Sequence, residues 1–306
     1  MNFTSFCYMI FQMIYVIMGP TCSGKTKAAN RLIDILGCEA INFDAFQIYK
    51  DMDIGTSKLS KDDPHYKHYH LLDIKKPSDT YSVMEYQRDC RKVLDNQLSK
   101  DKDVVLVGGT GLYVRAALYD YEFEVEEEAD DSDLEALSNE ELHKMLEELD
   151  LEASKKIHVN NRKRLLRAVS SIRRSDITKT ERLAKQRHKP IYKDVRFLFL
   201  NPDREKLYEN IDKRVLEMVD NGLVEEVRNL MNKYDLSLTA KQGIGYKEIM
   251  DFFVDNCSFE EAISLIQKRT RNYAKRQVTF FKNQFEFEEF KTVEELVNKV
   301  KGDKVC

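Results

Sequence analysis

Four short runs of apolar residues punctuate the chain, and helical patterns separate them. The runs are Ile14–Met18, Ala40–Phe43, Val104–Val107 and Val195–Leu200. Strands that are apolar on both faces and alternate with helices are typical of a parallel sheet. The pattern therefore predicts an α/β fold, a parallel sheet flanked by helices, with a helix to about Leu36 and more helices from about residue 203. Ligands of such sheets bind at the carboxyl ends of the strands, so we expect the functional residues directly after each strand.

The stretch between the third and fourth runs differs from the rest of the chain. Residues 120–152 carry 16 acidic side chains and one lysine, whereas residues 155–193 carry 14 lysines and arginines and two acidic side chains. Both stretches are rich in helix-forming residues. We predict an inserted all-helical domain at 119–194, a sheet domain from 13–118 and 195–306, and an N-terminal extension at 1–12. The role of the acidic segment 120–135 stays open.

This segregation changes the meaning of the net charge. The 306 residues include 49 Lys and Arg against 53 Asp and Glu, a formal net charge of −4. Taken alone, that value argues against a nucleic-acid partner. It averages an acidic segment with a basic one, however, and so leaves room for a locally basic surface.

Two further features bear on location. The six cysteines are scattered without a Cys-x-x-Cys pair, so we expect reduced thiols in a cytoplasmic protein rather than a zinc site or disulfides. The apolar segment from Phe3 to Met18 lacks the basic start of a signal peptide and the length of a membrane span. We therefore expect no membrane partner.

A phosphate-binding loop follows the first run. The segment fits the pattern G-x-x-x-x-G-K-[ST] and lies between a predicted strand and a predicted helix, the context in which this motif binds a di- or triphosphate. Backbone N–H groups of such a loop face the anion, a lysine adds a point charge and a hydroxyl can hold Mg²⁺. The residues are Gly19, Pro20, Thr21, Cys22, Ser23, Gly24, Lys25 and Thr26.

The next two runs end differently from those of an ordinary ATPase. Asp44 follows the second run, where a carboxylate can act as general base or metal ligand, although it can equally cap a turn. The third run ends in Gly108-Gly109-Thr110-Gly111 instead of the acid that holds Mg²⁺ in P-loop ATPases. Glycines there would admit a ligand to the backbone and Thr110 would face it, or Thr110 would cap a helix. The missing acid argues against ATP hydrolysis.

Two clusters of basic residues recur at helical spacing. Lys163, Arg164 and Arg167 lie in the insertion, and Lys268, Arg271 and Lys275 share one face of a later helix. One such cluster is usually a solvated face, but two favour a polyanion partner.

Two other groups of residues give little evidence of a functional site. His65, His68 and His70 are interleaved with Tyr and Lys and lack a fourth ligand, so we expect a loop rather than a metal site. Tyr273, Phe280, Phe281, Phe285 and Phe287 are expected in the core rather than in base stacking.

As a set, the motifs resemble the tRNA dimethylallyltransferase (isopentenyl-tRNA transferase) family, in its bacterial form. The resemblance runs from about Met13 to Asn283, with Ala45 where Ser is common and Cys22 where Ala or Gly is usual. The motifs in chain order are GPTCSGKT, DAFQIYKDMDIGTSK, HYHLLDIKKPSDTYS, VVLVGGTGLY, KRLLRA, DKRVLEMVDNGLVEEV, KQGIGYKEI and TRNYAKRQVTFFKN.

The resemblance implies an enzyme that moves the dimethylallyl group from its diphosphate to the exocyclic amine of the adenosine 3′ of the anticodon. The tRNAs concerned read codons that begin with U, and the enzyme would bind the anticodon stem-loop. We also expect a monomer, although the sequence does not fix the oligomeric state. Asp44 would be the general base, Thr110 and Arg214 would stabilise the departing diphosphate, and Gly19 to Thr26 would cradle it, with Mg²⁺ on Thr26. The implied tRNA-binding residues are Asp44, Ala45, Phe46, Gln47, Thr110, Lys163, Arg164 and Arg167.

Two alternatives stay open from the residues alone. A P-loop kinase would move phosphate from ATP to a small acceptor, although the Gly-Gly-Thr-Gly turn and the basic insertion argue against it. A non-catalytic RNA-binding protein would use the phosphate loop as a switch.

Overall fold

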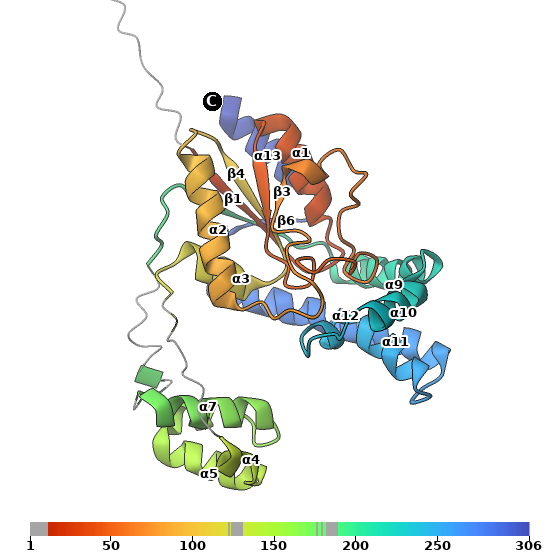
Figure 1. Cartoon of the computed structure of the whole chain (residues 1–306). Helices are drawn as coiled ribbons and strands as arrows, with labels where there is room; N and C mark the ends of the chain where they lie inside the picture. Colours follow the sequence, from red (N-terminus) through yellow and green to blue (C-terminus); the bar gives the residue numbers. More distant parts are fainter. Residues whose placement is uncertain are drawn as a thin grey trace, which may run out of the picture. The chain divides into compact units, whose positions relative to one another are not determined.

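The chain divides into two compact units. The computed structural model describes residues 12–121, 123, 131–175, 177–178, 180–181 and 189–305. One unit comprises Met1–Leu118 and Tyr192–Cys306, and the other comprises Tyr119–Ile191 (Figure 1). The sequence placed the second boundary at residue 194, and the predicted extension at 1–12 lies outside the described residues apart from Gln12.

A six-stranded, fully parallel sheet forms the centre of the first unit, which confirms the predicted α/β class. The strands lie in the order β3-β2-β4-β1-β5-β6. The predicted strands are β1 (Ile14–Met18), β2 (Glu39–Asn42), β4 (Val104–Gly108) and β5 (Val195–Leu200). The sequence analysis missed the two edge strands, β3 (Tyr69–His70) and β6 (Glu288–Phe290), because neither forms an apolar run.

The central strand β1 is buried over its whole length because neighbours cover it on every side. It pairs with β4 from Ile14 opposite Val104 and with β5 from Ile14 opposite Val195. All five residues of β1 and of β4 are buried. This burial on both faces explains the unbroken apolar runs.

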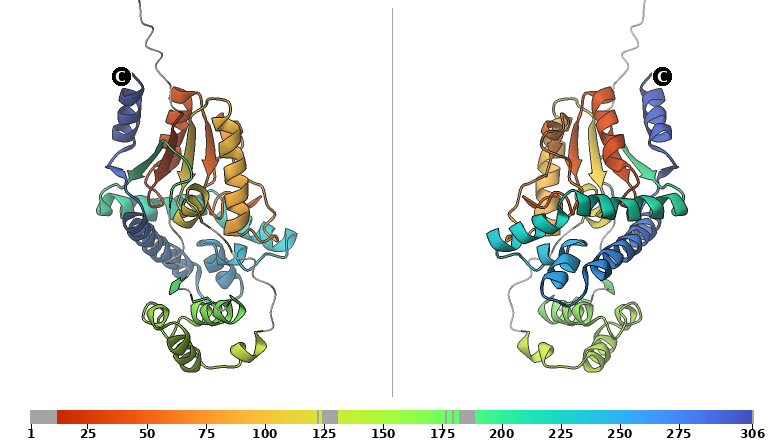
Figure 2. Two further views of the ribbon diagram at one scale, coloured as in Figure 1. Left: turned by 90° about the vertical axis from the view of Figure 1, so that its left-hand side faces the viewer. Right: turned by 90° about the vertical axis from the view of Figure 1, so that its right-hand side faces the viewer.

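Helices cover both faces of the sheet. Helices α1 (Lys25–Leu36) and α13 (Val293–Val305) pack together with β1 in one apolar core. Helix α2 (Val83–Leu98) lies on the opposite face, beside α3 (Gly111–Leu118) (Figure 2). Helix α2 begins at a capping box in which Ser82 and Glu85 satisfy each other's backbone N–H groups.

A helical layer lies beyond the carboxyl ends of the strands (Figure 1). It consists of α9 (Arg204–Asp220), α10 (Leu223–Lys233), α11 (Tyr246–Phe253) and α12 (Phe259–Gln284). Helix α12 packs closely against the turn after β4. The contact is so close that Cβ atoms at Gly109 and Gly111 would collide with Gln277 and Phe280. The functional segments of the sheet therefore face this layer.

The second unit is helical in its described part and has a core of its own. Its helices are α4 (Ser132–Glu135), α5 (Asn139–Leu149), α6 (Leu151–Ser154) and α7 (Arg162–Ser175). Their apolar faces bury a cluster that includes Leu142, Leu146, Leu165 and Val169. Part of the acidic segment 120–135 (residues 122 and 124–130) lies outside the described residues.

No helix in the described part of the chain is long and apolar enough to cross a membrane. The described cysteines Cys22, Cys38, Cys90 and Cys257 are free thiols, and Cys7 and Cys306 lie outside the described residues.

Candidate active site

The predicted phosphate loop joins β1 to α1 at the carboxyl edge of the sheet. A Cβ at Gly19 would collide with the carbonyl oxygen of Leu200, and Gly24 adopts φ +95° where α1 begins. Only glycine adopts either conformation at these contacts without strain. The hydroxyl of Ser23 is buried and has no hydrogen-bond partner within the described residues. The loop thus holds an unsatisfied donor below the start of a helix, as a phosphate site requires.

Lys25 lies in this loop with its charge weakened by burial. Its Nζ donates to the carbonyl oxygen of Pro20 at 2.6 Å. Removal from water lowers the pKa of Lys25 to about 8, with Asp44 opposing the change and Arg214 adding to it. Because Lys25 has no ion pair with any described residue, an anion bound in the loop would be its natural partner.

Asp44 follows β2 and uses its two carboxylate oxygens differently. Its Oδ1 accepts the backbone N–H groups of Phe46 at 2.9 Å and Gln47 at 3.4 Å, so the turn-capping interpretation is correct for this oxygen. Burial raises the pKa of the Asp44 carboxyl, against the opposing Phe46 N–H and the charge of Lys25. Asp44 lines two cavities, so both predicted roles fit one side chain.

The buried side chain of Asn42 fixes the backbone of Asp44. Its Oδ1 accepts the Asp44 N–H at 3.0 Å, and its Nδ2 donates to the carbonyl oxygens of Asp44 and Leu71 at 3.2 and 3.1 Å. Sequence reasoning missed Asn42. The only available signal was a polar residue at the end of an apolar strand.

The turn after β4 packs against the Asp44 loop instead of standing open. Thr110 donates its N–H to the Phe43 carbonyl oxygen, and its hydroxyl accepts the N–H of Ala45 at 3.1 Å. A Cβ at Gly108 would lie 2.6 Å from the backbone of Phe43. We expected these glycines to admit a ligand. Gly108 does line the polar cavity described below, whereas the space beside Gly109 is filled by the side chain of Gln277.

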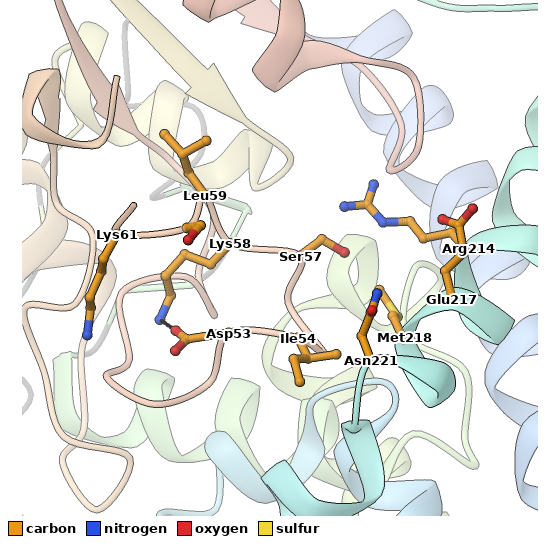
Figure 3. Close-up of a pocket in the computed structure, with 11 residues that line it drawn as sticks. Asp53, Ile54, Ser57, Lys58, Leu59, Lys61, Arg214, Glu217, Met218 and Asn221 are labelled. Atoms are coloured by element: carbon orange, nitrogen blue, oxygen red, sulfur yellow. Dashed lines mark hydrogen bonds and ion pairs between the residues drawn. The ribbon is translucent and has the colours of Figure 1, made fainter. Parts of the chain in front are cut away.

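Arg214, on α9, reaches the predicted phosphate loop. Its Nη1 lies 3.8 Å from the Sγ of Cys22, although 192 positions separate the two residues. Among the described carboxylates, none pairs with Arg214. Figure 3 shows its guanidinium facing the loop that carries Ser57, across a cavity of about 730 Å³. An unpaired guanidinium beside the phosphate loop suits a second phosphate group.

Two further cavities meet at Asp44 and Arg214. One, of about 370 Å³, is polar and contains Lys25, Thr26 and Gln47. The other, of about 240 Å³, is bounded mainly by apolar side chains. These are Phe46, Ile211, Val215, Met218, Ile244, Tyr246, Ile266 and Tyr273. The site can therefore hold an anionic group next to a small apolar group, with a carboxylate at the junction.

The aromatic residues of α12 divide between core and site. Phe281 and Phe285 are buried, as expected, but Tyr273 lines both of these cavities, so the expectation of a core position was wrong for it. Arg271 of the second basic cluster forms an ion pair with Asp212, which removes it from a free basic face. The described residues contain no group of three or more His, Cys, Asp or Glu placed to hold a metal, and His70 lies in strand β3.

The remaining predicted RNA-binding residues belong to the second unit. Lys163, Arg164 and Arg167 are exposed on α7 and form no ion pair within the described residues. Their neighbours differ, because Arg173 pairs with Asp133 and Arg174 with Asp131. Asp131 and Asp133 of segment 120–135 thus neutralise the far end of α7, whereas its start stays basic.

The fold and the site define a protein of the parallel α/β class in which the predicted phosphate loop adjoins a carboxylate and an apolar cavity. The family model described as IPP transferase matches residues 47–284. A tRNA dimethylallyltransferase of Bacillus anthracis is 40% identical over 287 residues, which cover 90% of this chain and 89% of that protein. The chain belongs to the IPP transferase family and is an enzyme of the tRNA dimethylallyltransferase class.

Solved structures agree with this assignment. A tRNA isopentenylpyrophosphate transferase of Staphylococcus epidermidis is 32% identical and has a TM-score of 0.70, covering 96% of this chain and 99% of that one. The full-length enzyme of Bacillus halodurans is 31% identical with a TM-score of 0.71, covering 96% of each. A eukaryotic dimethylallyltransferase described as acting on tRNA shares the fold with a TM-score of 0.79 at 23% identity, over 96% of this chain and 77% of that one.

Proposed function

We propose that this enzyme transfers the dimethylallyl group of dimethylallyl diphosphate to the exocyclic amine of the adenosine 3′-adjacent to the anticodon, in tRNAs that read codons beginning with U. The observation that carries the proposal is that Asp44 lies where the polar cavity of Lys25 meets the apolar cavity. That arrangement suits a diphosphate with a short hydrocarbon tail. The similarity to tRNA dimethylallyltransferases supports the choice of substrates.

The phosphate loop, Gly19 to Thr26, binds the diphosphate. Lys25 and the unpaired Arg214 neutralise its charge, and both gain as negative charge develops on the leaving group. The hydroxyl of Thr110, which accepts the Ala45 N–H, is the third donor that we assign to the same group, as the family resemblance implies.

Mg²⁺ fits the donor set of this loop. It is usually held by one or two protein oxygens together with substrate phosphates and water, so a carboxylate cage is not required. Thr26 lines the polar cavity with Lys25 and would supply the hydroxyl. When bound, the ion would neutralise the diphosphate.

Asp44 acts as the general base. The adenosine N6 attacks C1 of the dimethylallyl group, a C–N bond forms, and the C1–O bond breaks with its electron pair passing to the diphosphate. The N6 proton moves to the Asp44 carboxylate. A base whose pKa is raised by burial accepts this proton more readily, and such catalysis contributes about 10²–10⁴ in rate.

The tRNA brings the adenosine to the cavity by extruding it from the loop stack. Phe46 offers an apolar surface there, next to Ala45 and Gln47. Lys163, Arg164 and Arg167 contact the phosphate backbone of the anticodon stem-loop from the insertion. We propose that the enzyme works as a monomer in the cytoplasm.

The test is incubation with dimethylallyl diphosphate, Mg²⁺ and an unmodified anticodon stem-loop, followed by mass analysis of the nucleosides. We expect one dimethylallyl group on the adenosine 3′ of the anticodon, and no product when ATP replaces the donor. Asp44→Asn should reduce turnover about 10²-fold or more and keep tRNA affinity. Asp62→Asn, at an exposed loop residue, is the matched control. ATP consumption with transfer of phosphate would instead support a kinase.

A further inference from the structure

Three motifs of the sequence meet at one carboxylate that the proposed reaction does not use. Glu226, on α10, reaches the loop Asp53–Lys58 and the residue Tyr246 at the start of α11. Its Oε2 accepts the backbone N–H groups of Asp53 at 3.0 Å and Ile54 at 2.7 Å. Its Oε1 accepts the N–H of Gly55 at 3.1 Å and the hydroxyl of Tyr246 at 2.7 Å.

These four donors saturate the carboxylate. Three successive backbone N–H groups that converge on one anion form a nest, and hydrogen bonds to a charged acceptor are about twice as strong as neutral ones. Glu225, the preceding residue, is exposed and lies 3.9 Å from Arg228. Attraction of an acid to the first turn of a helix accounts for Glu225, but not for the four bonds of Glu226.

The ring of Tyr246, whose hydroxyl bonds Glu226, also packs against this loop. Tyr246 is 1% exposed, and a Cβ at Gly55 would lie 2.6 Å from its ring. The backbone at Gly55 is therefore fixed between a carboxylate and an aromatic ring, with no room for a side chain. Gln47 adds a third hold, since its Nε2 donates to the carbonyl oxygen of Thr56 at 3.0 Å.

The fixed loop forms a wall of the apolar cavity. Gly55, Thr56 and Ser57 line it, as does Tyr246. In Figure 3 the side chain of Ser57 points from this loop toward Arg214, while Lys58 turns back to Asp53. Thr56 and Ser57 line the polar cavity as well, but Gly55 and Tyr246, which bond Glu226 directly, line only the apolar one of these two cavities. Glu226 therefore controls chiefly the shape of the apolar side.

We propose that Glu226 is a positioning residue that holds the cavity wall against the hydrocarbon part of the prenyl donor. The identity of that ligand rests on the proposed function. Loss of the carboxylate releases the three N–H groups, so the cavity wall moves and its contact with the hydrocarbon is lost. The phosphate loop continues to bind the diphosphate. Affinity for the tail should therefore fall separately from affinity for the diphosphate.

The test measures binding of two probes by calorimetry in the presence of Mg²⁺: dimethylallyl diphosphate and inorganic pyrophosphate. In Glu226→Gln, we expect the Kd of dimethylallyl diphosphate to rise about five- to tenfold and that of pyrophosphate to change less than about twofold. Amide hydrogen exchange in residues 53–58 should accelerate. Glu225→Gln, one position away on the same helix, should match the wild type in all three measurements.

Several outcomes overturn the inference. They are equal weakening of both probes, no weakening of either, or unchanged exchange in residues 53–58. A misfolded variant is recognised by its unfolding curve, and Tyr246→Phe then serves as the second variant, with a smaller effect in the same direction. Because binding is measured without turnover, a wild type that binds the donor but does not modify tRNA contradicts the proposed function alone.

Discussion

Gln277 accepts the backbone N–H of Thr21 through its Oε1 at 2.9 Å, which ties α12 to the phosphate loop. Its Nε2 donates to the carbonyl oxygen of Gly109 at 3.0 Å. One buried amide thereby links the loop after β1 to the turn after β4. The proposed donor site and the turn that supports Asp44 are thus held at a fixed separation.

Replacement of Gln277 tests this link. Gln277→Ala leaves the part-buried N–H of Thr21 and the buried carbonyl of Gly109 without partners, so the free energy of unfolding should fall by about 2 kcal/mol. Urea unfolding measures this, and turnover should fall as well because the two loops lose their common support. Asn283→Ala, at an exposed position of the same helix, should change neither. A Gln277→Ala enzyme with normal stability and turnover would show that the amide is dispensable.

The pH dependence of donor use should be bell-shaped. The base form of Asp44 is lost as pH falls through its raised pKa, and the charge of Lys25 is lost as pH rises through about 8. Both groups act in the free enzyme, so the profile belongs to kcat/KM for the donor. Lys25→Arg keeps its charge at every working pH and should remove the alkaline limb. An alkaline limb that persists unchanged in this variant would assign it to another group.

Cys22 adopts φ +62°, an unfavourable backbone conformation for a residue with a Cβ. Cys22→Gly relieves this, partly offset by the greater freedom of glycine in the unfolded chain. The free energy of unfolding of Cys22→Gly should therefore be about 0.5–1 kcal/mol higher than that of Cys22→Ala, which keeps a Cβ. Paired denaturation curves measure the difference, and a less stable glycine variant would contradict the expectation.

Arg164 and Arg167 should contribute to tRNA affinity through phosphates. Each change to Ala should weaken binding and lower the slope of log affinity against log salt by about one. Titrations of the anticodon stem-loop at several salt concentrations measure both. Arg173→Ala is the control on the same helix, since this arginine already pairs with Asp133. If Arg164→Ala and Arg173→Ala behave alike, the start of α7 is a solvated face.

Much of the fold could be predicted, because the apolar pattern of a segment matches how deeply that segment is buried. A central strand such as Val104–Gly108 is apolar on both faces, so its sequence alone marks it. The two edge strands could not be predicted in this way. An edge strand of two or three residues is defined by its pairing with a neighbouring strand and not by its own sequence pattern, as in Tyr69–His70 and Glu288–Phe290.

The site divides in the same way. The phosphate loop and Asp44 were predicted because their chemistry is tied to consecutive residues after a strand. Arg214 was predicted only through a family resemblance, and Gln277 and Glu226 were not predicted at all. A polar residue on an amphipathic helix looks the same in sequence whether it faces water or buried backbone groups.

By itself, the sequence determined a parallel α/β sheet and a charged helical segment, and it predicted a phosphate loop, since each depends on nearby residues. Only the tertiary structure decided that Arg214 meets Cys22, that Gln277 joins two loops and that Glu226 holds the loop 53–55. These contacts join residues far apart in the chain. Their partners are mostly backbone N–H and C=O groups, which every residue carries and no sequence pattern distinguishes.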